Sequence, residues 1–340
     1  MKTLFGKMPD GREVYAYTIS AGDLSATILS YGATLQKLVH KGEDLVCGYD
    51  TLDEYRANGG YHGATVGRYA NRISGGKLTV DGVDYPINNN ERGTAHLHGG
   101  KVGFDKLVWE CEETVCEGCG APKVVCKLVS PDGDEGYPGK LDVTASYAIK
   151  DNALVLEYVA TTDKPTYLNM TNHSYFNLHG IANGTNKDHM LRINCDEVTD
   201  VDSKTLLPTG KRLDVTGTAF DFRTEKPLGR DHENTGLGIV GYDNNFVING
   251  KEKTTFGPHT LNVAAVCRTE ERTMTILTTK PSMQIYSAIG ANGPAFKGIA
   301  RRQNMSVAFE TQFEPDSPAK GEARLNPGET YHHVTIYKFD

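Results

Sequence analysis

The stretch KLDVTASYAIKDNALVLEYVATT, residues 140–162, alternates apolar and polar side chains on both sides of a short break. Such a period of two predicts β-strands, because successive side chains of a strand point to opposite faces of a sheet. Asp151 and Asn152 form the break, and these residue types tolerate the left-handed backbone of a tight hairpin turn. We therefore expect two antiparallel strands joined by a short turn.

The same alternation recurs on both sides of this hairpin. It is clearest in ATILSYGATLQKLVHKGEDLVCGYD (26–50), TMTILTTKPSMQIYSA (273–288) and ETYHHVTIYKF (329–339). Helical periodicity is scarce, and the best short helix is TLDEYRAN (51–58), which we expect Thr51 to cap. Neither a low-complexity linker nor a fixed-period repeat divides the chain. We predict an all-β fold, with a single domain over residues 1–340 that forms one large antiparallel sandwich or barrel with few short helices.

The composition of the 340 residues narrows the functional classes. The formal net charge is -7 and the longest basic run is Arg301-Arg302, so the sequence offers no cationic surface for a nucleic-acid backbone. No apolar stretch is long enough to cross a bilayer, and the N-terminal segment has no signal-peptide core. We expect a cytoplasmic protein with neither nucleic-acid nor membrane partners.

Four of the seven cysteines crowd into one segment: Cys111, Cys116, Cys119 and Cys126. An odd total favours free thiols in a reducing compartment over a disulfide framework. Four thiolates can close a tetrahedral structural zinc site, and Cys116-x-x-Cys119 has a suitable spacing. A β-hairpin whose loop holds thiols is favoured over zinc, because the second C-x-x-C pair of a zinc ribbon is absent.

Two polar segments each allow a structural and a functional interpretation. His96 and His98 stand two residues apart, so an extended backbone would point both rings to one face. The glutamate of a cupin-type metal site does not follow them, so a hydrogen-bonded or substrate-facing histidine is favoured over a metal pair. Arg68 and Arg72 flank Asn71, and they are either surface arginines or a guanidinium fork that binds hydroxyl groups beside an amide.

Taken alone, the local segments leave the roles of His173 and Glu310 undecided and favour a structural role for Asp243. His173 in TNHSYFNLHG (171–180) is either a satisfied polar group in a sheet or a proton-transfer group. Glu310 in VAFETQFEPDSP (307–318) faces either water at a strand edge or a buried site, and Asp243 in GYDNNFVI (241–248) is a turn aspartate. No nucleophile elbow, phosphate loop or dinucleotide motif is present. We therefore expect no organic cofactor, and acid–base chemistry on a hydroxylated ligand.

Eight motifs, taken together, resemble the aldose 1-epimerases, the galactose mutarotase family. In family order they are GRYANRI (67–73), HLHGG with GFDK (96–106), SPDGDEGYPG (130–139), TNHSYFNL (171–178), GYDNNF (241–246), MQIY (283–286), FETQFEPDSP (309–318) and LNPGETY (325–331). Each motif alone is weak, but the ordered set is specific and covers nearly the whole chain.

The resemblance implies one large β-sandwich, the supersandwich, and interconversion of the α and β anomers of free aldoses, usually galactose and glucose. It assigns the general acid to His173 and the general base to Glu310. At ordinary pKa values of about 6.5 and about 4.3, the histidine would be a usable proton donor and the glutamate would be ionised. It assigns sugar binding to Asn71, Arg72, His98, Asp243 and Gln284. It implies no cofactor, a small sugar as partner, and a monomer or homodimer.

Three features depart from the family pattern. Asn244 stands where a histidine is frequent, which bears on the contacts of Asp243. The stretch after Pro318 is shorter than usual, which bears on sugar preference, and the four-cysteine segment is unexpected.

Two alternatives to a mutarotase stay open. An epimerase-like protein for a phosphorylated or sulfonated sugar would need more cations than Arg72. A sandwich that binds carbohydrate without turnover would need no acid–base pair. A glycosidase would require two catalytic carboxylates, and only Glu310 is nominated.

Overall fold

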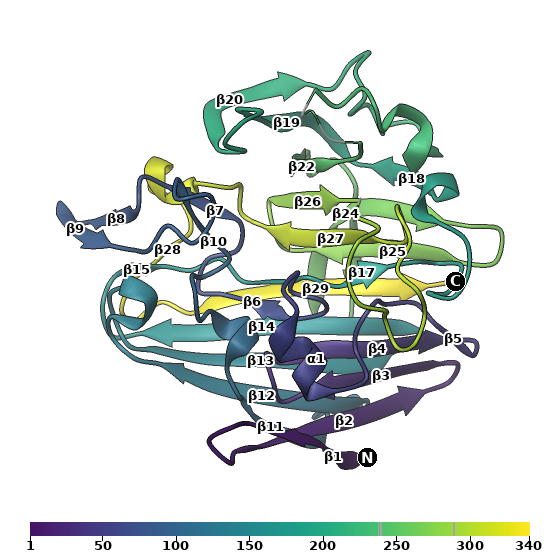
Figure 1. The fold of residues 1–340 in the computed structure, drawn as a ribbon, viewed down its shortest axis with the longest axis horizontal. Helices are drawn as coiled ribbons and strands as arrows, with labels where there is room; N and C mark the ends of the chain where they lie inside the picture. Colours follow the sequence, from purple (N-terminus) through teal and green to yellow (C-terminus); the bar gives the residue numbers. More distant parts are fainter. Residues whose placement is uncertain (237, 239, 288–289) are drawn as a thin grey trace.

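The computed structural model describes residues 1–236, 238, 240–287 and 290–340. All pairs of named strands in these residues are antiparallel, and Figure 1 shows the strands stacked from β20 at the top to β1 at the bottom. The prediction of an all-β sandwich with few short helices is confirmed.

The largest sheet has ten strands and includes the hairpin at residues 140–162. In spatial order it runs β11 (Glu110–Val115), β12 (Pro122–Ser130), β13 (Leu141–Lys150), β14 (Ala153–Thr162), β29 (Tyr331–Phe339), β25 (Thr273–Thr278), β24 (His259–Arg268), β18 (Met190–Ile193) and β21 (Lys226–Pro227), with β23 (Lys253–Phe256) beside β24. The C-terminal strand thus lies in the middle of the sheet.

A six-stranded sheet carries three of the seven residues that the sequence nominated for chemistry: Asp243, Gln284 and Glu310. Its order is β17 (Tyr175–Phe176), β27 (Val307–Gln312), β26 (Ser282–Tyr286), β22 (Asp243–Ile248), β19 (Cys195–Val201) and β20 (Pro208–Asp214). Every residue of β27 is buried, so this strand lies inside the molecule and brings Glu310 with it.

A five-stranded sheet, formed by the first residues of the chain, packs against the large sheet and completes the hydrophobic core. It consists of β1 (Lys2–Lys7), β2 (Glu13–Ala21), β3 (Leu24–Leu29), β4 (Thr34–His40) and β5 (Glu43–Asp44). β2 and β3 contact β12 and β13, so Leu24 and Ile28 share one core with Tyr147 and Leu156 of the large sheet. Each buried side chain of this size stabilises the fold by about 1.5–3 kcal/mol.

Short ribbons and helices complete the chain. The ribbons are β6 (Thr65–Val66) with β16 (Thr171–Asn172), β7 (Arg72–Ser74) with β10 (Ala95–Leu97), β8 (Lys77–Val80) with β9 (Val83–Pro86), and β15 (Thr166–Tyr167) with β28 (Arg324–Leu325). The helices are α1 (Leu52–Ala57) and the 3₁₀ turns η1 (Phe104–Lys106), η2 (Asp134–Gly136), η3 (Asn186–Asp188), η4 (Leu228–Asp231) and η5 (Ser317–Lys320). None of the helices in the described residues is long and apolar enough to span a membrane.

The hairpin at residues 140–162 forms as predicted. β13 and β14 pair along their full length, and Asp151 and Asn152 turn the chain with φ angles of 48° and 56°. The amide of Asn152 donates to the carbonyl of Phe339 at 2.7 Å. The turn is therefore tied to the neighbouring strand β29 as well as to its own hairpin.

The other predicted elements also form, with changed boundaries. Residues 26–50 contain most of β3 and all of β4 and β5. Residues 273–288 split into β25 and β26, which belong to two different sheets, and Ala288 lies outside the described residues. α1 begins after Thr51, whose hydroxyl accepts from the Glu54 backbone at 3.2 Å while Glu54 accepts from the Thr51 backbone at 3.0 Å. This reciprocal cap confirms the predicted helix start.

The four clustered cysteines form two disulfides, so the prediction of free thiols is wrong for them. Cys111 pairs with Cys126 because the register of β11 and β12 places these residues opposite each other. Cys116 pairs with Cys119 in the turn between the strands. The pairing of β11 and β12 confirms the hairpin, and sulfurs paired in this way offer no thiolate to a metal. The cytoplasmic location stays a prediction.

Candidate active site

Strand register brings His173 and Glu310 together. β17 pairs with β27 through Tyr175 opposite Ala308, and extending that register by two residues sets His173 opposite Glu310. The His173 Nε2 and Glu310 Oε1 atoms lie 3.4 Å apart. Both residues are buried, with exposed fractions of 4% and 2%. An imidazole and a carboxylate 137 positions apart therefore share one enclosed site.

The next two strands add an amide and a second carboxylate. Gln284 of β26 pairs with Glu310 on one side and with Asn245 of β22 on the other. Its amide Nε2 donates to Asp243 Oδ1 at 2.6 Å. Gln284 thus orients Asp243 beside Glu310, as expected for diagonal neighbours in a sheet.

The ribbon of β7 and β10 supplies Asn71, Arg72 and His98. The backbone N–H of Asn71 donates to His98 Nδ1 at 3.0 Å, and the backbone N–H of His98 donates to the Asn71 carbonyl at 3.1 Å. Both residues hold left-handed backbones, with φ of 67° for Asn71 and 51° for His98. Such values are uncommon outside glycine, and here a reciprocal pair of hydrogen bonds holds them in place.

A glutamate that the sequence analysis missed holds Arg72. Glu91 accepts from Arg72 Nε at 2.7 Å and from Nη2 at 2.9 Å, and Arg72 Nη2 lies 3.8 Å from Asp243 Oδ2. Burial lowers the pKa of Arg72, but the carboxylates of Asp243 and Glu91 more than offset this and raise it overall. Arg72 therefore stays a cation within the site.

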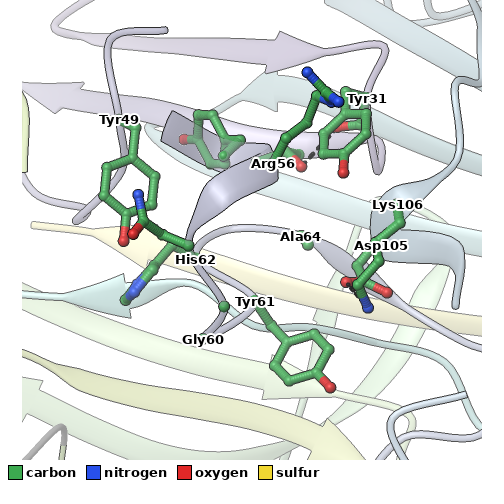
Figure 2. Close-up of a pocket in the computed structure, with 13 residues that line it drawn as sticks. Tyr31, Tyr49, Arg56, Gly60, Tyr61, His62, Ala64, Asp105 and Lys106 are labelled. Carbon is green, nitrogen blue, oxygen red and sulfur yellow. Dashed lines mark hydrogen bonds and ion pairs between the residues drawn. The ribbon is translucent and has the colours of Figure 1, made fainter. Parts of the chain in front are cut away.

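Aromatic rings enclose His173. The ring centroid of Tyr61 lies 5.8 Å from that of His173 and 4.6 Å from that of His98, and the ring of Tyr175 lies 4.8 Å from His173. Tyr61 also lines a cavity of about 330 Å³, which Figure 2 shows with His62 on one side and Lys106 on the other. The cavity therefore adjoins the His173–Glu310 pair without including it.

Burial drives the two paired groups toward their neutral forms. It lowers the pKa of His173 to about 4. Burial and the carboxylate of Asp243 raise the pKa of Glu310 well above its usual range, although Arg72 opposes this. Both shifts run away from the ordinary pKa values that the sequence suggests, and they favour a neutral imidazole beside a protonated carboxyl group.

His98 presents a hydrogen-bond donor. Burial lowers the pKa of His98 well below its usual value, so the ring is neutral. Because Nδ1 accepts from the Asn71 backbone, the proton of the neutral ring sits on Nε2. His98, His173 and Glu310 are close enough to surround a cation, but a protonated Nε2 is not a metal ligand. The arrangement suits hydroxyl groups better than a metal ion.

Two neighbouring residues prove to be structural. His96 bonds through Nδ1 to the carbonyl of Asn88 and through Nε2 to the hydroxyl of Tyr137, each at 2.8 Å. Both ring nitrogens are therefore occupied, which agrees with the choice of His98 over His96. Arg68 is 2% exposed and donates to Ser130 and to backbone carbonyls, so it is neither a surface arginine nor a sugar ligand.

One departure near the site acts on its backbone. The Asn244 side chain accepts from the backbone N–H of Asp243 at 3.2 Å, so it supports the chain beside that carboxylate. The shortened stretch after Pro318 begins inside η5. Asp316, directly before η5, donates its backbone N–H to the Arg72 carbonyl at 2.8 Å and so ties this end of the segment to β7.

All seven nominated residues gather in one ring of contacts. The ring runs from His173 to Glu310, then through Gln284, Asp243, Arg72, Asn71 and His98 back to His173. The residues that sequence reasoning missed are Glu91 and Tyr61. Glu91 lies in a polar loop with no periodic pattern, and Tyr61 follows two glycines, so neither carried a local signal.

Comparisons with known proteins agree on one family. A sequence model described as aldose 1-epimerase matches residues 15–338. Galactose mutarotase of Mus musculus is 36% identical over 99% of this chain and 98% of its own, and aldose 1-epimerase of Escherichia coli K12 is 33% identical over 97% and 96%. The crystal structure of a GalM/aldose epimerase homologue from C. elegans superposes with a TM-score of 0.82 at 32% identity, over 96% of this chain and 98% of that one.

These matches span almost the full length of the chain and of its relatives. They agree with the strand topology and with the gathering of the family's polar residue types around one buried acid–base pair. The chain belongs to the aldose 1-epimerase family and is an isomerase.

Proposed function

We propose that this protein is a mutarotase that interconverts the α and β anomers of free hexoses such as galactose and glucose. The observation that carries the proposal is the buried contact of 3.4 Å between His173 and Glu310. These groups can exchange a proton with each other and with the two oxygens that change partners in the reaction. A small sugar is the partner, and the proposal needs no cofactor.

Anomer exchange is a balanced proton relay. The hydroxyl on C1 loses its proton to Glu310, the ring oxygen gains one from His173, and the C1–O5 bond breaks to give the open aldehyde. Rotation about C1–C2 then presents the other carbonyl face. On closure His173 takes the proton from the C5 hydroxyl while Glu310 returns one to O1, so both groups regain their starting forms.

The paired site suits this relay because its two working states differ only in the position of one proton. Burial favours neutral histidine with protonated glutamate, which is the state that follows ring opening. Transfer of that proton from Glu310 to His173 gives the state that begins ring opening. The guanidinium of Arg72 lowers the pKa of Glu310 and so supports the carboxylate form.

The surrounding groups supply both hydrogen-bond donors and acceptors. His98 Nε2–H and Arg72 donate, Asp243 accepts, and the amides of Asn71 and Gln284 do both. Sugar hydroxyls require such a mixture. These contacts orient the pyranose so that O1 meets Glu310 and O5 meets His173. This orientation raises the reaction rate more than it raises the affinity for the sugar.

The two alternatives are less well supported. In the described residues of the ring, Arg72 is the one permanent cation and Glu91 already pairs with it, so a phosphorylated sugar would lack a counter-charge. A binding module would not need His173 and Glu310 in mutual contact inside a desolvated site. We further propose that residues 1–340 act as one domain, as a monomer or homodimer in the cytoplasm.

Polarimetry tests the function directly. Freshly dissolved α-D-galactose and α-D-glucose should reach their equilibrium rotation faster with the protein than without it, and the final rotation should be unchanged. Equal final rotations establish anomer exchange without net reaction. If a folded sample accelerates neither sugar, the proposed substrates are wrong.

A further inference from the structure

Glu91 is a partly buried carboxylate that touches the proposed sugar site through a single partner, Arg72. Its oxygens accept from Arg72 Nε at 2.7 Å and Arg72 Nη2 at 2.9 Å, which is a two-point pairing of carboxylate and guanidinium. The side chains are 17% and 9% exposed. Such a geometry fixes both the position and the plane of the guanidinium.

The loop that carries Glu91 is itself held in place. The backbone N–H of Glu91 donates to the Ala95 carbonyl at 3.1 Å, and the N–H of Ala95 donates back to the Glu91 carbonyl at 3.2 Å. Ala95 begins β10, which pairs with β7, the strand that carries Arg72. Both ends of the Glu91–Arg72 contact therefore rest on one ribbon.

The pairing decides which edge of Arg72 faces the sugar. A guanidinium has five N–H donors, and Glu91 takes one on Nε and one on Nη2. The donors of Nη1 and the second donor of Nη2 stay free for a ligand. The planar fork points them away from the Glu91 carboxylate, and Nη2 lies 3.8 Å from Asp243 Oδ2.

Without Glu91, Arg72 would have another carboxylate to bind. Asp243 Oδ2 lies 3.8 Å from Arg72 Nη2, which is an ion pair but too long for a hydrogen bond. A small rotation of an unrestrained guanidinium would close that gap. Asp243 would then lose the acceptor oxygen that a sugar hydroxyl needs, and Arg72 would lose its donors in the same step.

We propose that Glu91 is a positioning residue for anomer exchange, which holds Arg72 away from Asp243 so that both stay available to the sugar. This inference rests on the proposed function and on the place of Arg72 in the sugar site. Glu91 touches no reacting atom and acts through Arg72 alone.

A double-mutant cycle tests this route of action. The rates of galactose anomer exchange are measured for the native protein, Glu91→Ala, Arg72→Met and the double variant. Glu91→Ala should lower kcat/KM by up to about 100-fold, with KM raised and kcat lowered, because a misplaced binding group impairs orientation as well as affinity. In the Arg72→Met background, the same substitution should change kcat/KM by less than about twofold, because residues that act through one contact are not additive.

Two further variants separate positioning from folding. Glu225→Ala removes a comparable carboxylate, which pairs with Arg268 at 2.7 Å on the surface, and should leave kcat/KM unchanged. Glu91→Gln keeps the size of the side chain and one acceptor, so it should fold even if Glu91→Ala does not, and should lose less activity. Its unfolding temperature is measured alongside.

Each outcome bears on a distinct claim. Equal losses from Glu91→Ala in both backgrounds would show that Glu91 does not act through Arg72, and native rates in both Glu91 variants would remove its role altogether. If the native protein accelerated anomer exchange of neither galactose nor glucose, the proposed function would be overturned. That result is visible before any variant is measured.

Discussion

His173 and Glu310 each lie in surroundings that disfavour a charged side chain. Their protonation therefore sets an expected pH dependence of kcat/KM. The pair can work while it holds one proton, so kcat/KM should fall at high pH only when that proton leaves Glu310. Burial and Asp243 raise the pKa of Glu310. We therefore predict that the alkaline limb of kcat/KM lies above about 6.5, the value for an ordinary histidine acting as the acid. Initial rates of galactose anomer exchange across pH 6 to 9 provide the measurement.

A second variant tests the alkaline limb of the pH profile independently, because it removes a nearby negative charge and keeps the shape of the side chain. Asp243→Asn removes a carboxylate that raises the pKa of Glu310, so the limb should move to lower pH as the overall rate falls. An alkaline limb centred at or below about 6.5 in the native protein would show that the histidine titrates as an ordinary exposed group.

Single residues were predictable where a motif carried them, and otherwise not. His173, Glu310 and the five nominated sugar ligands each lay in a quoted motif, and the structure brings all of them together. Glu91 and Tyr61 reach the site through loop conformations that no periodic pattern encodes. The protonation of the pair was also out of reach, because a pKa shift depends on burial that only the folded sheets create.

At the scale of elements, the turn at Asp151 can be tested by substitution. Its φ of 48° is left-handed, and a β-branched residue there would be strained. Asp151→Val should lower the free energy of unfolding by about 1–2 kcal/mol. Asp151→Gly should be nearly neutral, because the side chain makes only a surface ion pair of 3.9 Å with Lys150. Urea unfolding of both variants compares them, and equal stabilities would contradict the turn geometry.

The four-cysteine hairpin should contribute to stability and not to chemistry. A disulfide that closes 15 residues, as Cys111–Cys126 does, stabilises a fold by up to about 3 kcal/mol. Reduction should therefore lower the unfolding temperature and leave kcat and KM for galactose unchanged. Thiol titration of the unreduced, denatured protein should find only Cys47, Cys195 and Cys267. Seven reactive thiols in that titration would contradict the pairing.

The sequence patterns predicted where the strands lie better than they predicted which strands pair. The alternation at 140–162 fixed both strands and the turn, because a hairpin is a local structure. The segment 273–288 showed two strands, but not that β25 and β26 enter different sheets around Thr279, Lys280 and Pro281. The prediction of free cysteines failed for the same reason. The odd number of cysteines in the chain said nothing about the register that sets Cys111 opposite Cys126.

For the whole molecule, buried neutral histidines predict acid sensitivity. Burial lowers the pKa values of His173, His189 and His232 to about 4, and those of His62 and His98 well below the usual value. In the unfolded chain these groups titrate near about 6.5, so the unfolded state binds more protons between the two values. Stability is full above pH 6.5 and falls as the pH drops toward 4, by up to about 3 kcal/mol for each of His173, His189 and His232.

That loss rivals the whole stability of a typical domain, so unfolding should set in between pH 6.5 and pH 4. Urea unfolding at several pH values measures it. His232→Phe should flatten the dependence, because His232 is 2% exposed and is none of the seven nominated site residues. A stability that is constant from pH 7 to pH 4 would contradict the burial of these rings.

The most direct test of the account compares polarimetric rates for the native protein, His173→Gln and Glu310→Gln on fresh α-D-galactose. Thr311→Val is the control, since Thr311 follows Glu310 on β27 and bonds to Thr335 instead of facing the site. Each glutamine variant should fold and lose roughly two to four powers of ten in rate, while the control keeps native turnover. Near-native rates in either glutamine variant would show that the buried pair is not the acid and base of the reaction.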